Sequence, residues 1–135
     1  TSIIGLELAR KQSLIEWFLA QRGAIRGYRR AIYSGITTLE CSRIVERMFV
    51  EHHDLCGVWN VASAPISKYE LLVRLSGLLQ REDIQITPDD YCVCDRSLCG
   101  HEFQERTVYR TPSWDEMLQE LATQITERRI GKVAA

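Results

Sequence analysis

The fold is decided by the stretch Gly57-Val-Trp-Asn-Val-Ala-Ser-Ala-Pro-Ile-Ser-Lys-Tyr-Glu70. Its first part, Val58 to Val61, is rich in β-formers and follows a glycine, which predicts a strand. Ala64-Pro65 ends that strand, because the residue before a proline avoids the helical region. Ser67 and Glu70 then form a capping box that opens a helix. A strand that passes through a short polar turn into a capped helix is typical of ligand-facing edges in α/β proteins, although it also serves as a plain connection.

The start signal at Ser67 occurs four times along the chain. Each serine or threonine is followed three residues later by a glutamate and then by apolar residues at helical spacing, which predicts four amphipathic helices. The four pairs are Ser13 with Glu16, Thr37 with Glu40, Ser67 with Glu70, and Ser113 with Glu116.

Short strands are expected between these helices. The β-rich segments are residues 25–32, 58–61, 84–86 and 91–94, and Thr1 to Leu6 reads as a further buried strand. The order predicts an α/β fold of about four helices with short strands, too small for a full doubly wound sheet. We expect one domain over residues 1–126, which we interpret as a piece of a longer protein, and a C-terminal tail over residues 127–135.

Composition excludes several classes of protein. The chain has 135 residues, 45% of them hydrophobic, and a net charge of −1. This suffices for one core and lacks the basic excess of a nucleic-acid binder. No apolar run approaches the ~20 residues of a membrane span. Five cysteines without framework spacing indicate reduced thiols and predict a cytoplasmic protein.

Two clusters of chemically active residues stand near residue 95. Cys92, Cys94, Cys99 and His101 lie within ten residues, but their spacing is not a common zinc spacing and also fits a strand with one buried face, so no metal site is predicted. In Asp95-Arg96-Ser97, the arginine can chelate a phosphate with the serine as a further donor. The alternative is an Asp–Arg surface pair with Ser97 capping a turn.

Motifs that would complete an enzyme are absent. There is no glycine-rich dinucleotide loop, no P-loop, no Gly-x-Ser-x-Gly elbow and no tyrosine with a lysine four residues on. His52 and His53 stand in a charged stretch typical of solvated surface. No catalytic residue is predicted in this chain.

Six segments in order carry a resemblance to a known family. They are residues 1–5, 13–18, 32–40, 65–72, 95–98 and 112–114. In this order they resemble the C-terminal, substrate-binding half of extended short-chain dehydrogenase/reductases that act on nucleotide-sugars, close to dTDP-4-dehydrorhamnose reductases and sugar-nucleotide epimerase/dehydratases. The resemblance spans roughly residues 1–122. Cys99-Gly100-His101, where relatives have an aspartate and a serine, and Arg29-Arg30 depart from it.

The resemblance implies that the NAD(P) loop and the catalytic Tyr-x-x-x-Lys belong to a preceding Rossmann half. This chain would then bind no NAD(P) and be inactive alone. Its cofactor-facing residues would be Ser2 and Gly5, at the nicotinamide end of the cleft. The substrate-binding residues that it implies are Arg96, Ser97, Thr37, Thr38, Lys68 and Arg30.

The leading hypothesis is therefore the substrate-binding half of an NAD(P)-dependent nucleotide-sugar reductase. Alternatives are an epimerase or dehydratase of nucleotide-sugars, a stand-alone binding or interaction domain, and a small metal-binding module. The expected partners are the nucleotide-sugar, the Rossmann half and a second copy of the chain, with no nucleic acid and no membrane. Self-association is expected because loss of the Rossmann half uncovers the face of Ile3 and Ile4.

Overall fold

The computed structural model describes the backbone of residues 1–133, which form five helices and seven short strands. The helices are α1 (Leu14–Ala20), α2 (Thr38–Glu51), α3 (Lys68–Leu78), α4 (His101–Thr107) and α5 (Trp114–Val133). The strands are β1 (Ile3–Ile4), β2 (Gly23–Tyr28), β3 (Ala31–Tyr33), β4 (Ile36–Thr37), β5 (Ile66–Ser67), β6 (Ile84–Asp89) and β7 (Cys94–Arg96). The α/β class predicted from the sequence is confirmed.

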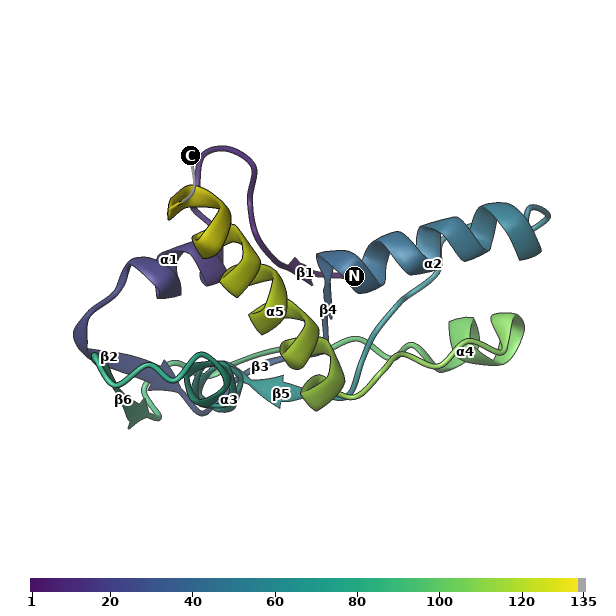
Figure 1. Ribbon diagram of the computed structural model, residues 1–135. Helices are drawn as coiled ribbons and strands as arrows, with labels where there is room; N and C mark the ends of the chain where they lie inside the picture. Colours follow the sequence, from purple (N-terminus) through teal and green to yellow (C-terminus); the bar gives the residue numbers. More distant parts are fainter. Residues whose placement is uncertain (134–135) are drawn as a thin grey trace.

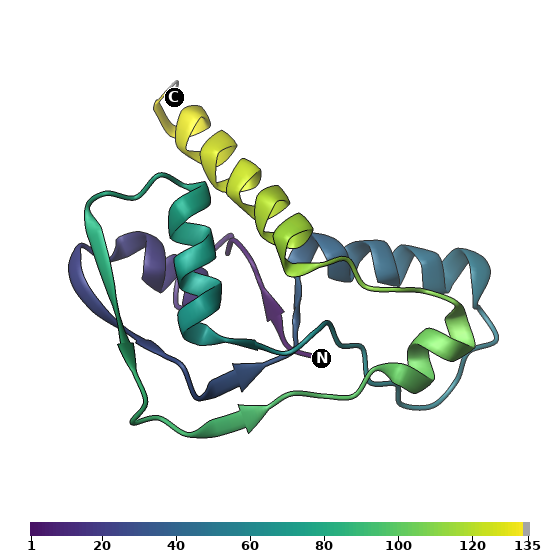
Figure 2. The same cartoon turned by 90° about the horizontal axis from the view of Figure 1, so that it is seen from below.

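The strands pair into three small sheets rather than one. β1 pairs in parallel with β4, and β2 pairs in parallel with β6. The third sheet has the order β5-β3-β7, with β3 antiparallel to β5 and parallel to β7. Figure 1 shows α5 rising above the strands and α3 end-on beside β3 and β5, while α2 extends away from the strands above α4. Figure 2 shows α3 and α5 side by side.

The hydrophobic core lies between these helices and the strands. α1, α3 and α5 each bury one apolar face, as their 3.6-residue periodicity predicts. The fully buried side chains from these helices are Ile15, Phe18, Leu71, Leu72, Leu75, Met117, Leu118, Leu121 and Ile125. No helix in the described part of the chain is long and apolar enough to cross a membrane.

All four predicted N-caps form. The side-chain oxygens of Ser13, Thr37, Ser67 and Ser113 accept hydrogen bonds from the backbone N–H three residues on, at 3.0 to 3.4 Å. The reciprocal bond of a full capping box forms at Ser113, whose N–H donates to Glu116 at 2.8 Å. The other three glutamates bind partners elsewhere, namely Arg128, Tyr109 and Arg74. Glu16 and Glu40 thus join distant parts of the chain instead of closing their caps, whereas Glu70 pairs with Arg74 within α3.

The structure has one helix more than the four that the start signals predict. α4 begins after Gly100, which offers no side-chain cap, so the start signal of the other helices is missing there. Phe103 and Thr107 bury its inner side. Gly100 packs tightly on the preceding segment, because a Cβ there would lie 3.0 Å from the backbone nitrogen of Ala62.

The expected strand at Val58 to Val61 is also wrong. The segment is irregular, and Val58 is 98% exposed. The first backbone hydrogen bond after this segment is at Ser63, whose N–H donates to the Ser34 carbonyl at 2.9 Å. The strand of this region is β5, which lies after Pro65 because there the backbone meets β3. β-propensity without a partner strand therefore did not produce a strand.

The remaining strand predictions are shifted. The segment 25–32 is split into β2 and β3 by a turn at residues 29–30, and β6 continues beyond Pro88 to Asp89. Pro88 is tolerated because β6 is an edge strand. The strand expected at residues 91–94 is β7, displaced to Cys94–Arg96 by its register with β3.

The tail predicted at residues 127–135 does not begin as a separate segment. α5 continues without interruption through residue 126 to Val133. Arg128, within that stretch, forms a two-pronged ion pair with Glu16 of α1. Residues 134–135 lie outside the described part of the chain.

Candidate functional site

The three-stranded sheet brings together residues that are far apart in the sequence. In its register, Tyr33 of β3 faces Arg96 of β7 on one side and Ile66 of β5 on the other. Cys94 lies opposite Ala31, and its N–H donates to the carbonyl of Arg30 at 3.0 Å. The start of α3 follows β5 directly, so Lys68 reaches the same region.

A cavity of about 320 Å³ opens over one face of this sheet. Side chains alternate between the two faces of a strand, so Ala31 shares a face with Tyr33, and Cys94 with Arg96. These residues line the cavity, and Ile32, from the intervening position of β3, lines it as well. The complete lining is Ser2, Ile4, Leu14, Ala31, Ile32, Tyr33, Lys68, Cys92, Cys94 and Arg96.

The cavity is cationic at its polar groups and apolar elsewhere. Lys68 and Arg96 both line it, and no carboxylate does. Two positive charges without a counter-charge attract an anion, and the arginine fork matches phosphate oxygens in particular. The arrangement therefore favours a phosphorylated ligand with an apolar portion.

Tyr33 places an unpaired hydroxyl beside the cavity. Its oxygen is buried without a hydrogen-bond partner among the described residues. The ring packs on Trp114, with centroids 5.6 Å apart. Gly35 makes room for it, because a Cβ there would lie 2.3 Å from the Tyr33 oxygen. Burial raises the pKa of the Tyr33 phenol, so the hydroxyl stays a donor at neutral pH.

Ser97 is bonded to Asp95 rather than held free for a ligand. Its N–H and its hydroxyl donate to the same carboxylate oxygen of Asp95, at 2.9 and 2.7 Å. These bonds lower the pKa of Asp95. The turn at this point is therefore closed by the Asp95 carboxylate, which accepts from Ser97, and Ser97 is not held free for a ligand.

Three of the eight residues implied by the family resemblance line the cavity together. They are Ser2, Lys68 and Arg96. The side chains of Ser97 and Arg30 do not line it, although the Arg30 carbonyl supports β7. Arg96 and Lys68 are thus brought together from opposite edges of one sheet.

Gly5, Thr37 and Thr38 lie instead around the β1–β4 pair. Thr37 is buried and caps α2, accepting from the Glu40 N–H at 3.3 Å. Gly5 packs directly on Thr38, because a Cβ at Gly5 would lie 2.2 Å from the Thr38 hydroxyl oxygen. These contacts build the wall behind Ser2 and Ile4, and none of the three lines the cavity.

Seven of the ten lining residues were not predicted as binding residues, and three of the seven carry a hydroxyl or a thiol. These three are Tyr33, Cys92 and Cys94. For the two cysteines, the available signal was their two-residue spacing with Arg96, since Cys94 and Arg96 share one face of β7. From the sequence alone, that spacing is explained by a strand with one buried face, without a connection to a binding site.

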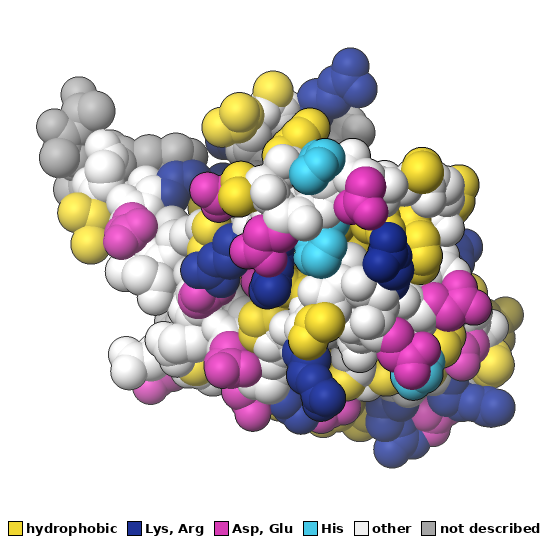
Figure 3. Space-filling model, turned by 90° about the vertical axis from the view of Figure 1, so that its right-hand side faces the viewer, with side chains coloured by type: hydrophobic (Ala, Val, Ile, Leu, Met, Phe, Trp, Pro, Cys, Tyr) yellow, Lys and Arg dark blue, Asp and Glu magenta, His cyan; other side chains and the backbone are white. Residues whose placement is uncertain are grey.

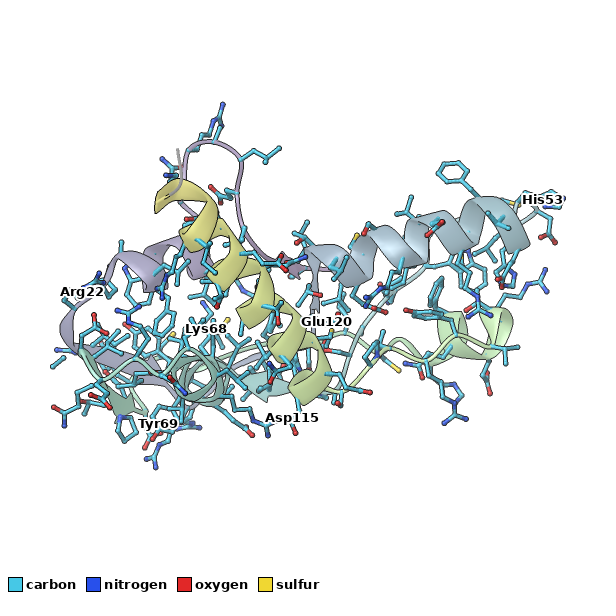
Figure 4. The ribbon with its side chains drawn as sticks, in the orientation of Figure 1. Arg22, His53, Lys68, Tyr69, Asp115 and Glu120 are labelled. Carbon is cyan, nitrogen blue, oxygen red and sulfur yellow. The ribbon has the colours of Figure 1, made fainter. Side chains whose placement is uncertain are left out.

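Metal and histidine chemistry finds no support at this cavity. Among the described residues, no group of three or more His, Cys, Asp or Glu side chains is placed to hold a metal ion. Figure 4 shows His53 beyond the end of α2, far from Lys68. On the face that α2 and α4 present, Figure 3 shows basic, acidic and histidine side chains interspersed.

Two further cavities have few cationic side chains that are not already paired with a carboxylate. One of about 420 Å³ lies along α3 and β6 and includes Tyr69, Val73 and Ile84. Another, of about 480 Å³, includes Arg22 and Arg128. Arg22 is paired with Asp83 at 2.8 Å and Arg128 with Glu16, so these two charges are already neutralised.

The fold is that of part of the nucleotide-sugar reductases and dehydratases, as solved structures show. No family model and no curated protein matches the chain. The described fold nevertheless superimposes on enzymes of this class at 13 to 16% identity, which establishes the likeness of fold.

Two of these structures are dTDP-4-dehydrorhamnose reductases. The one from Bacillus anthracis, in complex with NADP, is 14% identical at a TM-score of 0.68, over 90% of this chain and 46% of that one. The one from Clostridium acetobutylicum is 16% identical at a TM-score of 0.64, over 92% and 46%. The third structure is the dTDP-glucose 4,6-dehydratase from Bacillus anthracis in complex with NAD. It is 13% identical at a TM-score of 0.66, over 93% of this chain and 42% of that one.

The chain thus spans less than half the length of the solved structures that it matches. The sequence resemblance predicts part of the fold of such an enzyme, and this prediction is confirmed.

Proposed function

We propose that this chain is the substrate-binding half of an NAD(P)-dependent nucleotide-sugar reductase similar to dTDP-4-dehydrorhamnose reductase. The observation that supports it most is the cavity with Lys68 and Arg96 and no carboxylate, on a fold shared with such reductases. A nucleotide-sugar carries a diphosphate between two less charged ends. Its charge fits the cationic groups, and its base or sugar fits the apolar wall.

Each lining group has a defined part in this proposal. Arg96 chelates the diphosphate through two parallel N–H bonds, and Lys68 adds a point charge. Ile4 and Leu14 supply apolar contact for a ring of the ligand. The unpaired hydroxyl of Tyr33 donates to a ligand oxygen once a small movement of the ring exposes it.

The cofactor belongs to the preceding half in this proposal. The chain has no glycine-rich loop to hold a pyrophosphate, and Gly5 is closed off by Thr38. Of the two residues expected near the nicotinamide, only Ser2 lines the cavity. The residues present do not fit NAD(P) by themselves, and we expect the isolated chain to be inactive.

A dehydratase is the second candidate. The dehydratase structure superimposes almost as well as the reductases, with a TM-score of 0.66 against 0.68. The two functions share the diphosphate site and differ in chemistry that the preceding half would supply.

Calorimetric titration tests the proposal. The isolated chain should bind dTDP and dTDP-glucose with similar affinity and thymidine at least about tenfold more weakly, because the diphosphate carries the charge that Arg96 and Lys68 meet. NADPH should give no saturable signal. Equal binding of thymidine and dTDP, or tight binding of NADPH, would contradict the proposal.

A further inference from the structure

The cavity contains two thiols whose chemistry the proposed function does not use. Cys92 and Cys94 both line it, and both are half-buried and free. Cys94 opens β7 and Cys92 lies two residues before it, and the two side chains line the same cavity. Neither is part of a metal-ligand cluster among the described residues.

Arg96 stands next in the same series. Two residues of a strand span about 6.6 Å, and Arg96 is two residues beyond Cys94 on the same face. Asp95, between them, is directed to the opposite face, where it bonds Ser97. The thiols therefore share their cavity with the cations Arg96 and Lys68 and with no carboxylate.

From this we infer that Cys92 and Cys94 form a thiol-modification site selective for anionic disulfides, which closes the cavity when modified. The cationic groups hold the carboxylates of the disulfide while a cysteine sulfur attacks one of its sulfur atoms. The cysteine loses its proton to water, a new S–S bond forms to the protein, and the second half of the reagent leaves as a thiolate. One disulfide is consumed for each one formed, so no further oxidant is needed.

The other three cysteines provide internal controls. Cys56 and Cys99 are exposed, and Cys41 is half-buried on α2. None of the three lines this cavity. Exposure alone would make Cys56 and Cys99 react first with any reagent, whereas the inference demands that charge selects Cys92 and Cys94.

The test compares an anionic and a neutral disulfide on the same protein. Dithiobis(nitrobenzoate) carries two carboxylates, and dithiodipyridine carries no charge at neutral pH. We expect the double variant Cys92→Ser/Cys94→Ser to lose the fast phase with the anionic reagent, while Cys56→Ser/Cys99→Ser keeps it. Mass spectrometry of peptides should place the first adduct on Cys92 or Cys94.

Arg96→Gln separates charge from access. It should slow the anionic reagent about tenfold at low salt and leave the neutral reagent within about twofold, because a cationic cleft concentrates anions. Arg96→Lys, which keeps the charge, should restore most of the rate. Equal slowing of both reagents, or a fast phase that survives in the Cys92→Ser/Cys94→Ser variant, would overturn the inference. Circular dichroism of each variant checks that the fold is retained.

The consequence for ligand binding rests on the proposed function. The modified protein should lose binding of dTDP, and a thiol reductant should restore it. The labelling experiment uses no dTDP. If the chain did not bind nucleotide, the proposed function would be contradicted, but the inferred modification site would not.

Discussion

Glu16 and Arg128 join the first helix to the last. Arg128 Nη2 lies 3.1 Å from Glu16 Oε2, and its second nitrogen binds the other carboxylate oxygen. The side chain of Glu16 is only 4% exposed. The same carboxylate accepts the N–H of Glu7 at 2.9 Å, which fixes the loop between β1 and α1. This pair therefore holds the loop that follows the cavity residues Ser2 and Ile4.

Arg128→Ala should destabilise the chain by about 3 kcal/mol, because it leaves a buried carboxylate unpaired. Urea unfolding measures the change. Arg129→Ala, an exposed neighbour on the same helix, is the matched control and should shift the free energy of unfolding by less than about 0.5 kcal/mol. Equal effects of the two variants would show that the ion pair contributes nothing specific.

The same pair predicts a pH dependence. The hydrogen bond from Arg128 lowers the pKa of Glu16 below its ordinary value of 4.5. A carboxylate with a lowered folded pKa stabilises the fold above its unfolded pKa, and this stability is lost as pH falls through the folded pKa. Wild-type stability should fall below about pH 4.5, with a smaller slope in Glu16→Gln. An identical slope in that variant would assign the acid sensitivity to other carboxylates.

Tyr109 should contribute to stability through Glu40. Glu40 is fully buried, its Oε1 accepts the Tyr109 hydroxyl, and its Oε2 has no hydrogen-bond partner among the described residues. Tyr109→Phe removes the hydroxyl and should destabilise the fold by about 2 kcal/mol. Tyr91→Phe, at a tyrosine that is 91% exposed, should be neutral in the same thermal or urea unfolding experiment. A neutral Tyr109→Phe would mean that water replaces the phenol.

Local signals in the sequence predicted helix starts better than strands. The four N-caps depend on one side chain and a backbone N–H three residues away, so a short stretch of sequence contains the whole interaction. α4 was not predicted, because Gly100 before it has no side chain that could form such a bond. Val58 to Val61 failed because β-propensity does not specify a partner, and β3 pairs with Ile66–Ser67 instead.

The candidate site was predictable only in part, for the same reason. Arg96 and Lys68 were each predicted to bind substrate. That both line one cavity depends on the strand order β5-β3-β7, which joins segments far apart in the sequence. Tyr33 became a lining residue through its register with Arg96. A pairing between strands far apart in sequence leaves no local pattern that one sequence can reveal.

Arg96→Ala should weaken dTDP binding at least about tenfold, and raise the KM for the nucleotide-sugar similarly in a complete enzyme, because a charged bond to phosphate is lost. Arg30→Ala is the informative control. Arg30 was implied by the same resemblance, but its side chain does not line the cavity, so dTDP affinity should stay within about twofold. If Arg30→Ala weakened binding as much as Arg96→Ala, the ligand would occupy a different surface from the one assigned here.

Self-association of the isolated chain is the last prediction. The face expected to drive it included Ile3 and Ile4, but Ile4 is buried and only Ile3, 53% exposed, is available. Phe49 and Val50 of α2 add apolar surface at 78% and 73% exposure. Figure 1 shows β1 beside the start of α2, whereas Phe49 and Val50 belong to the last turn of that helix, so the two contributions form separate apolar patches. Burying them against a second copy would remove apolar area from water.

Light scattering at micromolar concentration should therefore give about twice the 15.6 kDa chain mass. Phe49→Ser and Ile3→Ser should each shift the population toward monomer. Val108→Ser, at an apolar residue that is 81% exposed just after α4, is the control and should leave the mass unchanged. A wild-type chain that stays monomeric would show that these apolar side chains do not suffice for a dimer, and would favour the stand-alone binding domain over a half that has lost its partner.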